Sequence, residues 1–443
     1  MPTPSATPPE KGATGERLGV GRLLRTRGYR RLLAVRFATQ WGDGMFQAAL
    51  GGAVLFNPER QADPLAVAAG LAVLLLPYSL IGPFAGALLD RWDRKRVLMF
   101  ANLLRSVLVL VVAATVFSGV VGLPLYLSAL AVAGVTRFVL AGLSASLPHV
   151  VPRQHIVEAN VLAVTIGSGM TALGAATAIG LRIVVGSGDT GSGVTTAIAV
   201  LGSLLAALLA AGFRSGLLGP DRTNEHPKAM VAVARGFVDG ARATFSNPTI
   251  SASFFALGAH RLAFGISTLL SLMLFRYAFT DDGLMRAGLP GIGEAVVVAA
   301  AGLLTAALVT PWLVRKWGRP RTVRVALVVA AVTQLLLAAL LALPTVLAAA
   351  FVLGLAGQVV KLCTDAAVQT DAGDEVLGRV FALYDVVFNA AYVLAVSAAA
   401  FLSPKDGHSP ALFAAAAAVY VVGLLVHNQQ LRRRRVVAAT PPS

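Results

Sequence analysis

Long apolar runs separated by short polar connections make up the chain from residue 32 to residue 427. Each run is close to the length of an α-helix that crosses a bilayer, which takes about 20 apolar residues. The pattern therefore predicts an all-α membrane protein with twelve transmembrane helices. The predicted spans are residues 32–56, 65–89, 97–117, 123–150, 157–185, 194–213, 250–279, 292–314, 322–343, 345–370, 377–402 and 411–427.

The connections between these spans alternate in charge. Those that follow an even-numbered span are basic, as in residues 91–96, 214–242 and 315–324, whereas those that follow an odd-numbered span hold few cations. Lys and Arg are enriched in the short cytoplasmic loops of membrane proteins. We therefore expect a multi-pass protein of the plasma membrane with both termini in the cytoplasm.

Composition supports a membrane protein and argues against other classes. The 443 residues are 56% hydrophobic and only 13% charged, whereas a soluble protein carries about 25% charged residues. The net charge of +16 would suit nucleic acid, but the cations lie in short loops, where membrane orientation explains them. The one cysteine, Cys363, allows no disulfide within the chain and no multi-thiolate metal site. We expect no metal, no cofactor, no nucleic-acid partner and no enzymatic activity.

The polar segments divide the chain into five regions. Residues 228–245 place apolar side chains at helical spacing between polar ones, which predicts an amphipathic helix at the cytoplasmic surface. The predicted regions are 1–31 (cytoplasmic tail and basic amphipathic segment), 32–213 (first six-helix bundle), 214–249 (linker with this helix), 250–428 (second six-helix bundle) and 429–443 (basic cytoplasmic tail).

One basic connection occurs twice in the chain. Residues 86–96 and residues 311–321 align without gaps, at an offset of 225 residues. A motif that recurs at half the chain length indicates an internal repeat, which is typical of secondary transporters. We therefore expect the two bundles to be pseudo-symmetric. The matched pairs are Arg91 and Lys316, Trp92 and Trp317, Arg94 and Arg319, and Arg96 and Arg321.

The first copy of this motif resembles a family signature. Gly-x-Leu-x-Asp-Arg-x-x-Arg-Lys-Arg is similar to the loop between the second and third helices of the major facilitator superfamily. Its Asp-Arg-x-Asp-Arg form resembles the drug:proton antiporter branch with enterobactin, macrolide and multidrug exporters; Asp93 stands where the family usually has glycine. The resemblance implies the major facilitator fold and a cytoplasmic gating loop, in which Asp90 and Arg94 latch the bundles near Gly378. The loop residues are Gly86, Asp90, Arg91, Arg94, Lys95 and Arg96.

Glycines in the fifth span favour close packing of helices, because small residues let two backbones approach. They are Gly167, Gly169, Gly174 and Gly180. Proton-driven exporters of the family typically have a Gly-Pro pair here, and this chain has no proline in the span.

Polar side chains inside the spans are the candidates for transport chemistry. A charge at the middle of a spanning helix costs about 3 kcal/mol to insert, so it should face a partner, water or the interior. The candidates for proton coupling are Asp43, Arg137 and Asp385. The candidates for a substrate cavity are Gln40, Gln47, His260, Arg261, Gln358, Lys361, Asp365, Tyr384 and Asn389.

Asp43 is the carboxylate that we expect to carry a proton. Burial disfavours the charged form of a carboxylate and a nearby cation favours it. A cavity that opens to one side and then to the other changes both effects. Arg137 is the expected partner, because the family tends to carry an arginine in this span. The alternative is a static buried pair between Asp43 and Arg137 that fixes the packing of the helices.

The remaining candidates keep two interpretations each. Lys361 and Asp365 are four residues apart and either line the cavity or pair along one helix. Asp385 and Asn389 either line the cavity or bond to neighbouring helices. The adjacent pair His260 and Arg261 is a polar lining or a proton relay. A further carboxylate, Glu294, is closer to the end of its span and is expected to be solvated.

Together these features predict a secondary transporter that works by alternating access. We expect a monomer that exports a small amphiphilic or hydrophobic molecule in exchange for protons. One alternative is a facilitator, importer or flippase of the same fold that moves a nutrient or lysophospholipid. Another is a membrane receptor or scaffold that does not transport.

Overall fold

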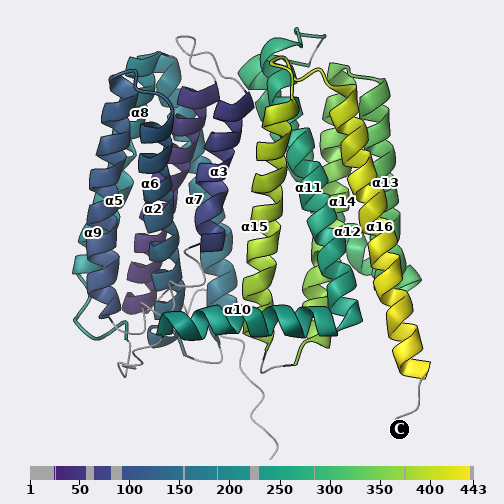
Figure 1. Ribbon diagram of the computed structural model, residues 1–443. Helices are drawn as coiled ribbons and strands as arrows, with labels where there is room; N and C mark the ends of the chain where they lie inside the picture. The colour runs from purple at the N-terminus through teal and green to yellow at the C-terminus, as the bar shows by residue number, and fades with distance from the viewer. Residues whose placement is uncertain are drawn as a thin grey trace, which may run out of the picture.

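The computed structural model describes residues 24, 26–55, 64–80, 92–152, 155–186, 188–219, 229–283, 285–373 and 376–439. These residues form a bundle of long helices in two halves (Figure 1). The first half contains α2 (Arg27–Leu55), α3 (Pro64–Leu80), α5 (Arg94–Phe117), α6 (Leu123–Ser146), the 3₁₀ turn η1 (Leu147–His149), α7 (Ile156–Val185), α8 (Asp189–Ile198) and α9 (Val200–Ala211). The second half contains α11 (Pro248–Tyr277), α12 (Gly288–Trp317), α13 (Arg319–Ala339), α14 (Leu343–Asp371), α15 (Leu377–Leu402) and α16 (Pro410–Ala439).

The prediction of an all-α fold with twelve spans is confirmed within the described residues, because α8 and α9 together make the sixth span with a break at Ala199. Ten of the spans have the length and hydropathy to cross a membrane. The other two are α2, in which Arg36 and Asp43 lie, and α3, which is described for 17 residues.

Most helix boundaries lie within a few residues of the predicted ones, and the main difference is at the C-terminus. The last span is predicted to end at residue 427, with a basic tail from residue 429, but α16 continues to Ala439. Residues 428–435, Asn-Gln-Gln-Leu-Arg-Arg-Arg-Arg, include strong helix formers. Arginines also suit the negative end of the helix dipole. Polarity ends the membrane span here, but it does not end the helix.

Side-chain caps define the start of two helices. Asp93, at the position where the family signature has glycine, accepts a hydrogen bond from the Lys95 backbone N–H at 3.0 Å and caps α5. Asp93 Oδ2 also accepts a hydrogen bond from the Ser215 hydroxyl at 2.6 Å. Asn247 caps α11 in the same way, ahead of Pro248. Such caps satisfy backbone donors that a helix leaves unpaired at its N-terminus.

The internal repeat is visible in matching contacts of the two halves. Arg94 begins α5 and its Nη1 donates to the carbonyl oxygen of Ala145, at the end of α6, at 2.9 Å. Arg319 begins α13 and its Nη1 donates to Thr370 Oγ1, at the end of α14, at 2.8 Å. Each pair spans 51 residues of sequence, and the two pairs are 225 residues apart. The repeated motif therefore ties equivalent helices in each half.

Helices α2 and α7 pack closely through glycine. A Cβ atom at Gly44 would collide with the backbone of Thr171, and one at Gly174 would collide with the backbone of Trp41. Gly167 lies against the side chain of Gln40. Open space surrounds Gly169, as it does Gly180, on the same helix. Of the four glycines predicted to allow close packing, Gly174 thus does so directly against the α2 backbone and Gly167 against an α2 side chain.

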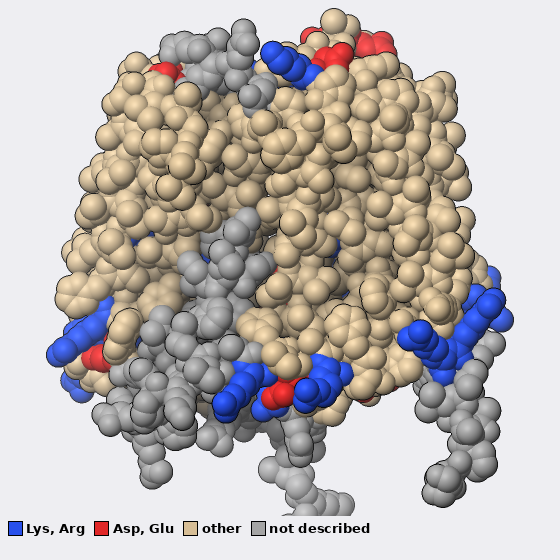
Figure 2. Space-filling model, in the orientation of Figure 1, with Lys and Arg blue, Asp and Glu red and all other residues tan. Residues whose placement is uncertain are grey.

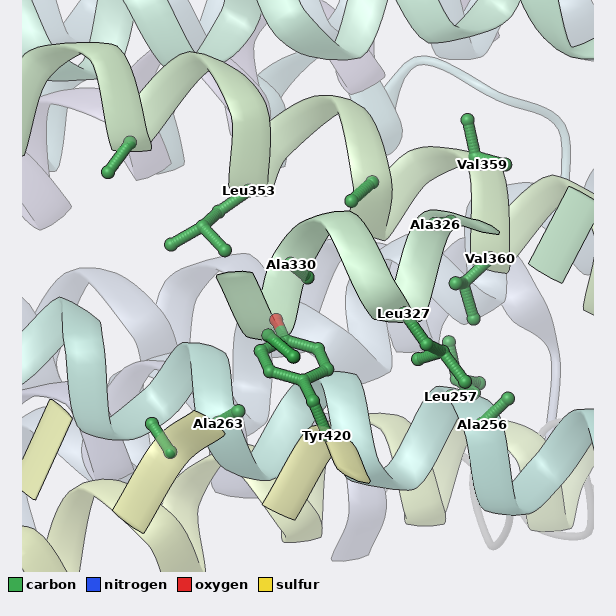
Figure 3. Close-up of a cluster of buried hydrophobic side chains, with 14 of the residues drawn as sticks. Ala256, Leu257, Ala263, Ala326, Leu327, Ala330, Leu353, Val359, Val360 and Tyr420 are labelled. Carbon is green, nitrogen blue, oxygen red and sulfur yellow. The ribbon is translucent and has the colours of Figure 1, made fainter. Parts of the chain in front are cut away.

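Among the described residues, the first half has two main apolar clusters. One large apolar cluster forms the core of the second half, and Figure 3 shows part of it. Tyr420 of α16 is fully buried there, with its ring beside Ala330 of α13. Leu257 of α11 and Val360 of α14 belong to the same cluster. The lone cysteine, Cys363, is also buried in this core.

A smaller apolar cluster joins the two halves, and we call it the inter-half contact. It packs α3 of the first half against α11 and α15 of the second. It lies toward the N-terminal end of α3 and the C-terminal end of α15, at the end of the molecule opposite to α10 (Ala229–Ser246). Its buried residues are Val67, Ala68, Leu269, Met273, Tyr392, Val396, Ala399 and Ala400.

The predicted amphipathic helix is α10, which crosses the lower end of the bundle in Figure 1. Gly240 of α10 lies against the backbone of Arg379 at the start of α15, and Asp239 pairs with the Arg379 side chain at 3.5 Å. Arg242 and Phe245 are exposed. On the face seen in Figure 2, Lys and Arg gather at this end, which we call the basic end, while the opposite end is richer in Asp and Glu.

Candidate functional site: polar groups within the bundle

Asp43 lies in a buried polar network that joins three helices. The Asp43 side chain is 8% exposed and lies 3.5 Å from Nη2 of Arg105, whose side chain is fully buried. Gln47, one turn further along α2, donates its Nε2 to the Asp43 carboxylate at 2.7 Å. Arg105 Nη1 donates to Ser203 Oγ of α9 at 2.8 Å. The carboxylate is therefore held by α2 itself and by a cation from α5.

The expected partner of Asp43, Arg137 of α6, interacts with it electrostatically. The structure adds a second cation that the sequence did not pair with Asp43, namely Arg105 of α5, which lies 3.5 Å from the carboxylate. Arg105 could have been found from the sequence, because it is the only charge in the apolar run of residues 97–117. Two cations thus act on one carboxylate in the first half.

Gln40 lies one turn before Asp43 on α2 but has a different neighbour. Its Oε1 accepts a hydrogen bond from Arg36 Nε at 3.1 Å. Helical spacing places Gln40, Asp43 and Gln47 on one face, as predicted, although the structure bonds only the last two to each other. Gln40 thereby stabilises a cation toward the start of α2.

A second polar group lies on α14 and α15. Lys361 Nζ pairs with Asp365 Oδ2 at 2.7 Å along α14, so the structure shows the pairing that the spacing allowed. The same ammonium lies 5.8 Å from the ring centroid of Tyr384. Asp385 interacts electrostatically with both Lys361 and Asp365. Two carboxylates and one ammonium therefore share this part of the second half.

Asp385 is exposed even though it lies in the first half of a long spanning helix. By helical spacing it shares a face of α15 with Tyr392 and Val396, which belong to the inter-half contact. This face is therefore turned toward the first half. Asn389 donates Nδ2 to the backbone oxygen of Asp385 at 2.9 Å, within α15. Gln358 is half-buried on α14.

His260 and Arg261 are adjacent in sequence but point to different surroundings. His260 is buried, and its Nδ1 lies 2.8 Å from the Tyr420 hydroxyl in the core of the second half. Arg261 donates Nε to the backbone oxygen of Phe388 at 2.7 Å. Its guanidinium carbon lies 3.9 Å from the Phe388 ring centroid and 4.5 Å from that of Tyr392. Arg261 therefore faces α15, whereas His260 packs against α16.

Glu294 lies at the less basic end of the molecule. Its Oε2 accepts the backbone N–H of Arg286 at 3.1 Å, in the connection between α11 and α12. In the same connection the Ala287 N–H and the Arg286 side chain bond to Asp281, and they lower the pKa of that carboxyl. Asp281 is exposed in this connection, whereas Glu294 is half-buried near the start of α12 and bonds back to the connection.

Only part of the predicted gating loop is described. Gly86, Asp90 and Arg91 lie outside the described residues, whereas Lys95 is half-buried and Arg96 is exposed. Besides its bond to α6, Arg94 donates Nη1 to the backbone oxygen of Leu218 at 3.3 Å, within the first half. The latch between the bundles stays a prediction.

Comparison with known proteins identifies the family. The profile described as Major Facilitator Superfamily matches residues 32–396, which is most of the chain. The chain belongs to the major facilitator superfamily. Two similar relatives in this superfamily are an uncharacterized MFS-type transporter of Mycobacterium bovis and one of Mycobacterium tuberculosis. Each is 43% identical over 393 residues, which cover 87% of this chain and 88% of the relative.

Solved structures agree with this fold. A point mutant of the nucleoside transporter NupG is similar with a TM-score of 0.66 and 13% identity, over 91% of this chain and 99% of that one. A POT family transporter in complex with 5-aminolevulinic acid gives a TM-score of 0.65 and 15% identity, over 90% and 95%. At such low identity these structures support the major facilitator fold and not a shared substrate. The protein is thus a membrane transporter of the major facilitator type.

Proposed function

We propose that the protein is a secondary active transporter that exports a small amphiphilic molecule in exchange for protons, by alternating access, in the plasma membrane. The observation that carries the proposal is the contact of one buried carboxylate, Asp43, with Arg105 in a network that also reaches Arg137. Burial disfavours the charge of a carboxylate and nearby cations favour it, so the two effects oppose each other. A change in hydration on either side alters that balance, which is the property that proton coupling requires.

The distribution of charge supports an orientation for this transporter. Basic side chains gather at the end where α10 lies (Figure 2), and cationic loops are retained in the cytoplasm. The inter-half contact then closes the outer end, so the described conformation holds the outer side shut. The direction of transport follows from the resemblance of the gating loop to the drug:proton antiporter branch of exporters. In that scheme Asp90 and Arg94 hold the opposite conformation.

The experiment that tests the proposal replaces Asp43 by asparagine, which keeps the size of the side chain and removes its charge. A thermal-shift screen of antibiotics, siderophores and lysolipids on purified protein first selects a ligand, since ligands raise stability by mass action. Proton flux driven by that ligand is then measured in everted membrane vesicles. We expect Asp43→Asn to insert and to bind the ligand but to lose ligand-driven proton flux.

The control variant is Asp281→Asn, whose carboxylate lies in the exposed connection between α11 and α12. It should keep the proton flux of the wild type. Full ligand-driven flux in Asp43→Asn would exclude Asp43 as the proton carrier. Ligand transport without any proton flux in the wild type would exclude antiport.

A further inference from the structure

Arg261 differs from the other cations in the middle of the spans. Arg105 pairs with the Asp43 carboxylate, which also acts on Arg137, and Lys361 pairs with Asp365. No ion pair joins Arg261 to a carboxylate within the described part of the chain. A cation inside the membrane is costly unless a partner or water compensates it. Compensation for the charge of Arg261 must therefore come from water, from the surrounding groups or from a bound anion.

The surroundings of Arg261 hold its guanidinium in place without neutralising it. Nε is used by the backbone oxygen of Phe388, and the Phe388 and Tyr392 rings lie against the guanidinium. Aromatic faces attract a cation but leave the donors at its edge available. Neither Nη atom is among the fully buried unpaired atoms of the described residues, although neither makes a hydrogen bond there. The two Nη groups thus keep some exposed surface and unused hydrogen-bond donors.

The acidic cluster of Asp365 and Asp385 interacts with Lys361 and not with Arg261. Asp385 lies three residues before Phe388 on α15, but its electrostatic neighbours are Lys361 and Asp365. The neighbours of Arg261 are instead the tyrosines at positions 384, 392 and 420. The polar groups of the second half are therefore divided into an acidic cluster and a separate cationic, aromatic one.

We propose that Arg261 binds an anionic group of the transported molecule, a carboxylate or a phosphate, while the rings of Phe264 and Phe388 contact its apolar part. Both rings are half-buried and lie beside the cation or its aromatic support. A planar guanidinium recognises two oxygens of such an anion through parallel hydrogen bonds. This inference rests on the proposed transport function and narrows its substrate class to anionic amphiphiles.

The test compares four naphthalene probes of nearly equal size that differ in charge. They are 1-naphthoate, 1-naphthyl phosphate, the neutral 1-naphthamide and the cationic 1-naphthylmethylammonium. Binding to the full chain in lipid nanodiscs is measured by isothermal titration calorimetry, with empty nanodiscs subtracted. We expect the wild type to bind at least one of the anions more tightly than the neutral and cationic probes.

The variants separate the role of Arg261 from its packing. Arg261→Gln should weaken binding of the anions by about ten- to a hundredfold, which is the range for a lost charge-assisted hydrogen bond. Arg261→Lys keeps the charge but lacks the planar guanidinium. Its affinity for the anions should lie between those of the wild type and Arg261→Gln. Arg276→Gln, in the last turn of α11, is the matched control and should bind as the wild type does.

If Arg261→Gln does not fold, the relative affinities of the wild type for the four probes still test the proposal. Equal or tighter binding of the neutral or cationic probe would overturn the proposal. So would the absence of binding by both anions, or unchanged anion binding in a folded Arg261→Gln variant. If the anions bind as expected but neither they nor any screened ligand is transported, the transport function fails and the anion site stands.

Discussion

At the scale of the residue, charge inside the membrane is handled by local pairing. Arg105 and Asp43 neutralise each other, and Ser203 and Gln47 take up further hydrogen-bonding capacity. Removing one partner of a buried pair is more damaging than removing both, because the remaining charge is left uncompensated. The energetic role of this pair can therefore be separated from any role in proton transfer.

Arg105→Met should destabilise the protein by about 3–5 kcal/mol, since it leaves the Asp43 carboxylate buried without its direct partner. The double variant Arg105→Met with Asp43→Leu should recover most of that loss. Apparent unfolding temperatures in one detergent measure the loss of stability in the single variant and its recovery in the double variant. As a control, Arg286→Met breaks an exposed pair with Asp281 and should change stability little. Equal effects of Arg105→Met and Arg286→Met would show that the buried pair is not important for stability.

The candidate site was only partly predictable from these residues. Single charges in apolar runs are visible in a sequence, so Asp43, Arg261 and Asp385 could be singled out without coordinates. Which charges meet depends on how helices rotate against one another, and that is set by packing far along the chain. This is why the sequence paired Asp43 with Arg137 but did not bring Arg105 to the same carboxylate. The separation of His260 from Arg261 depends on packing in the same way.

At the scale of the element, hydrophobic length determines the spans and glycine determines how closely two of them pack. The α-helices were predictable because a membrane span needs a long apolar run, and most boundaries followed. The extension of α16 was not, because a helix can continue beyond the apolar run that places it in the membrane. Close packing of α7 was predictable only as a tendency, because the sequence does not show which helix its glycines face.

The glycines of the α2–α7 contact offer a matched comparison. Gly44→Ala and Gly174→Ala place a Cβ against the backbone of the neighbouring helix and should destabilise by about 1–3 kcal/mol. Gly169→Ala and Gly180→Ala lie on α7 in open space and should be neutral, or stabilising by about 0.5–1 kcal/mol, because alanine favours a helix. Thermal unfolding of the four variants in detergent measures the difference. If all four behave alike, close packing through glycine does not stabilise the α2–α7 contact.

At the scale of the whole molecule, the two halves are related by an internal repeat and pack together through the apolar inter-half contact. The repeat could be predicted from the two tryptophan motifs, and equivalent arginines tie equivalent helices in each half. The sequence could not show at which end the halves meet, because apolar residues cover the lipid-facing surface as well as the interfaces of a membrane protein. Packing of α3 against α15 places that contact at the end away from α10.

The apolar character of the inter-half contact has a consequence for temperature. Opening it exposes side chains such as Val67, Met273 and Val396 to water. The stabilisation that comes from burying apolar surface weakens on cooling. In the alternating-access cycle proposed above, cold should therefore favour the conformation in which the end away from α10 is open. Turnover then slows in the cold for a second reason besides slower motion, since the balance of the two conformations also moves.

Spin labels can measure this shift in a Cys363→Ser background, because Cys363 is the only cysteine of the chain. One cysteine at Thr190 and one at Lys405 place a label on each half, at the end away from α10. Samples equilibrated between about 35 and about 5 °C before freezing should show a growing population of longer distances as the temperature falls. A pair at Val121 and Thr190, within the first half, should stay unchanged. A distance between the halves that does not respond to cooling would mean that hydration of this contact does not determine which way the molecule faces.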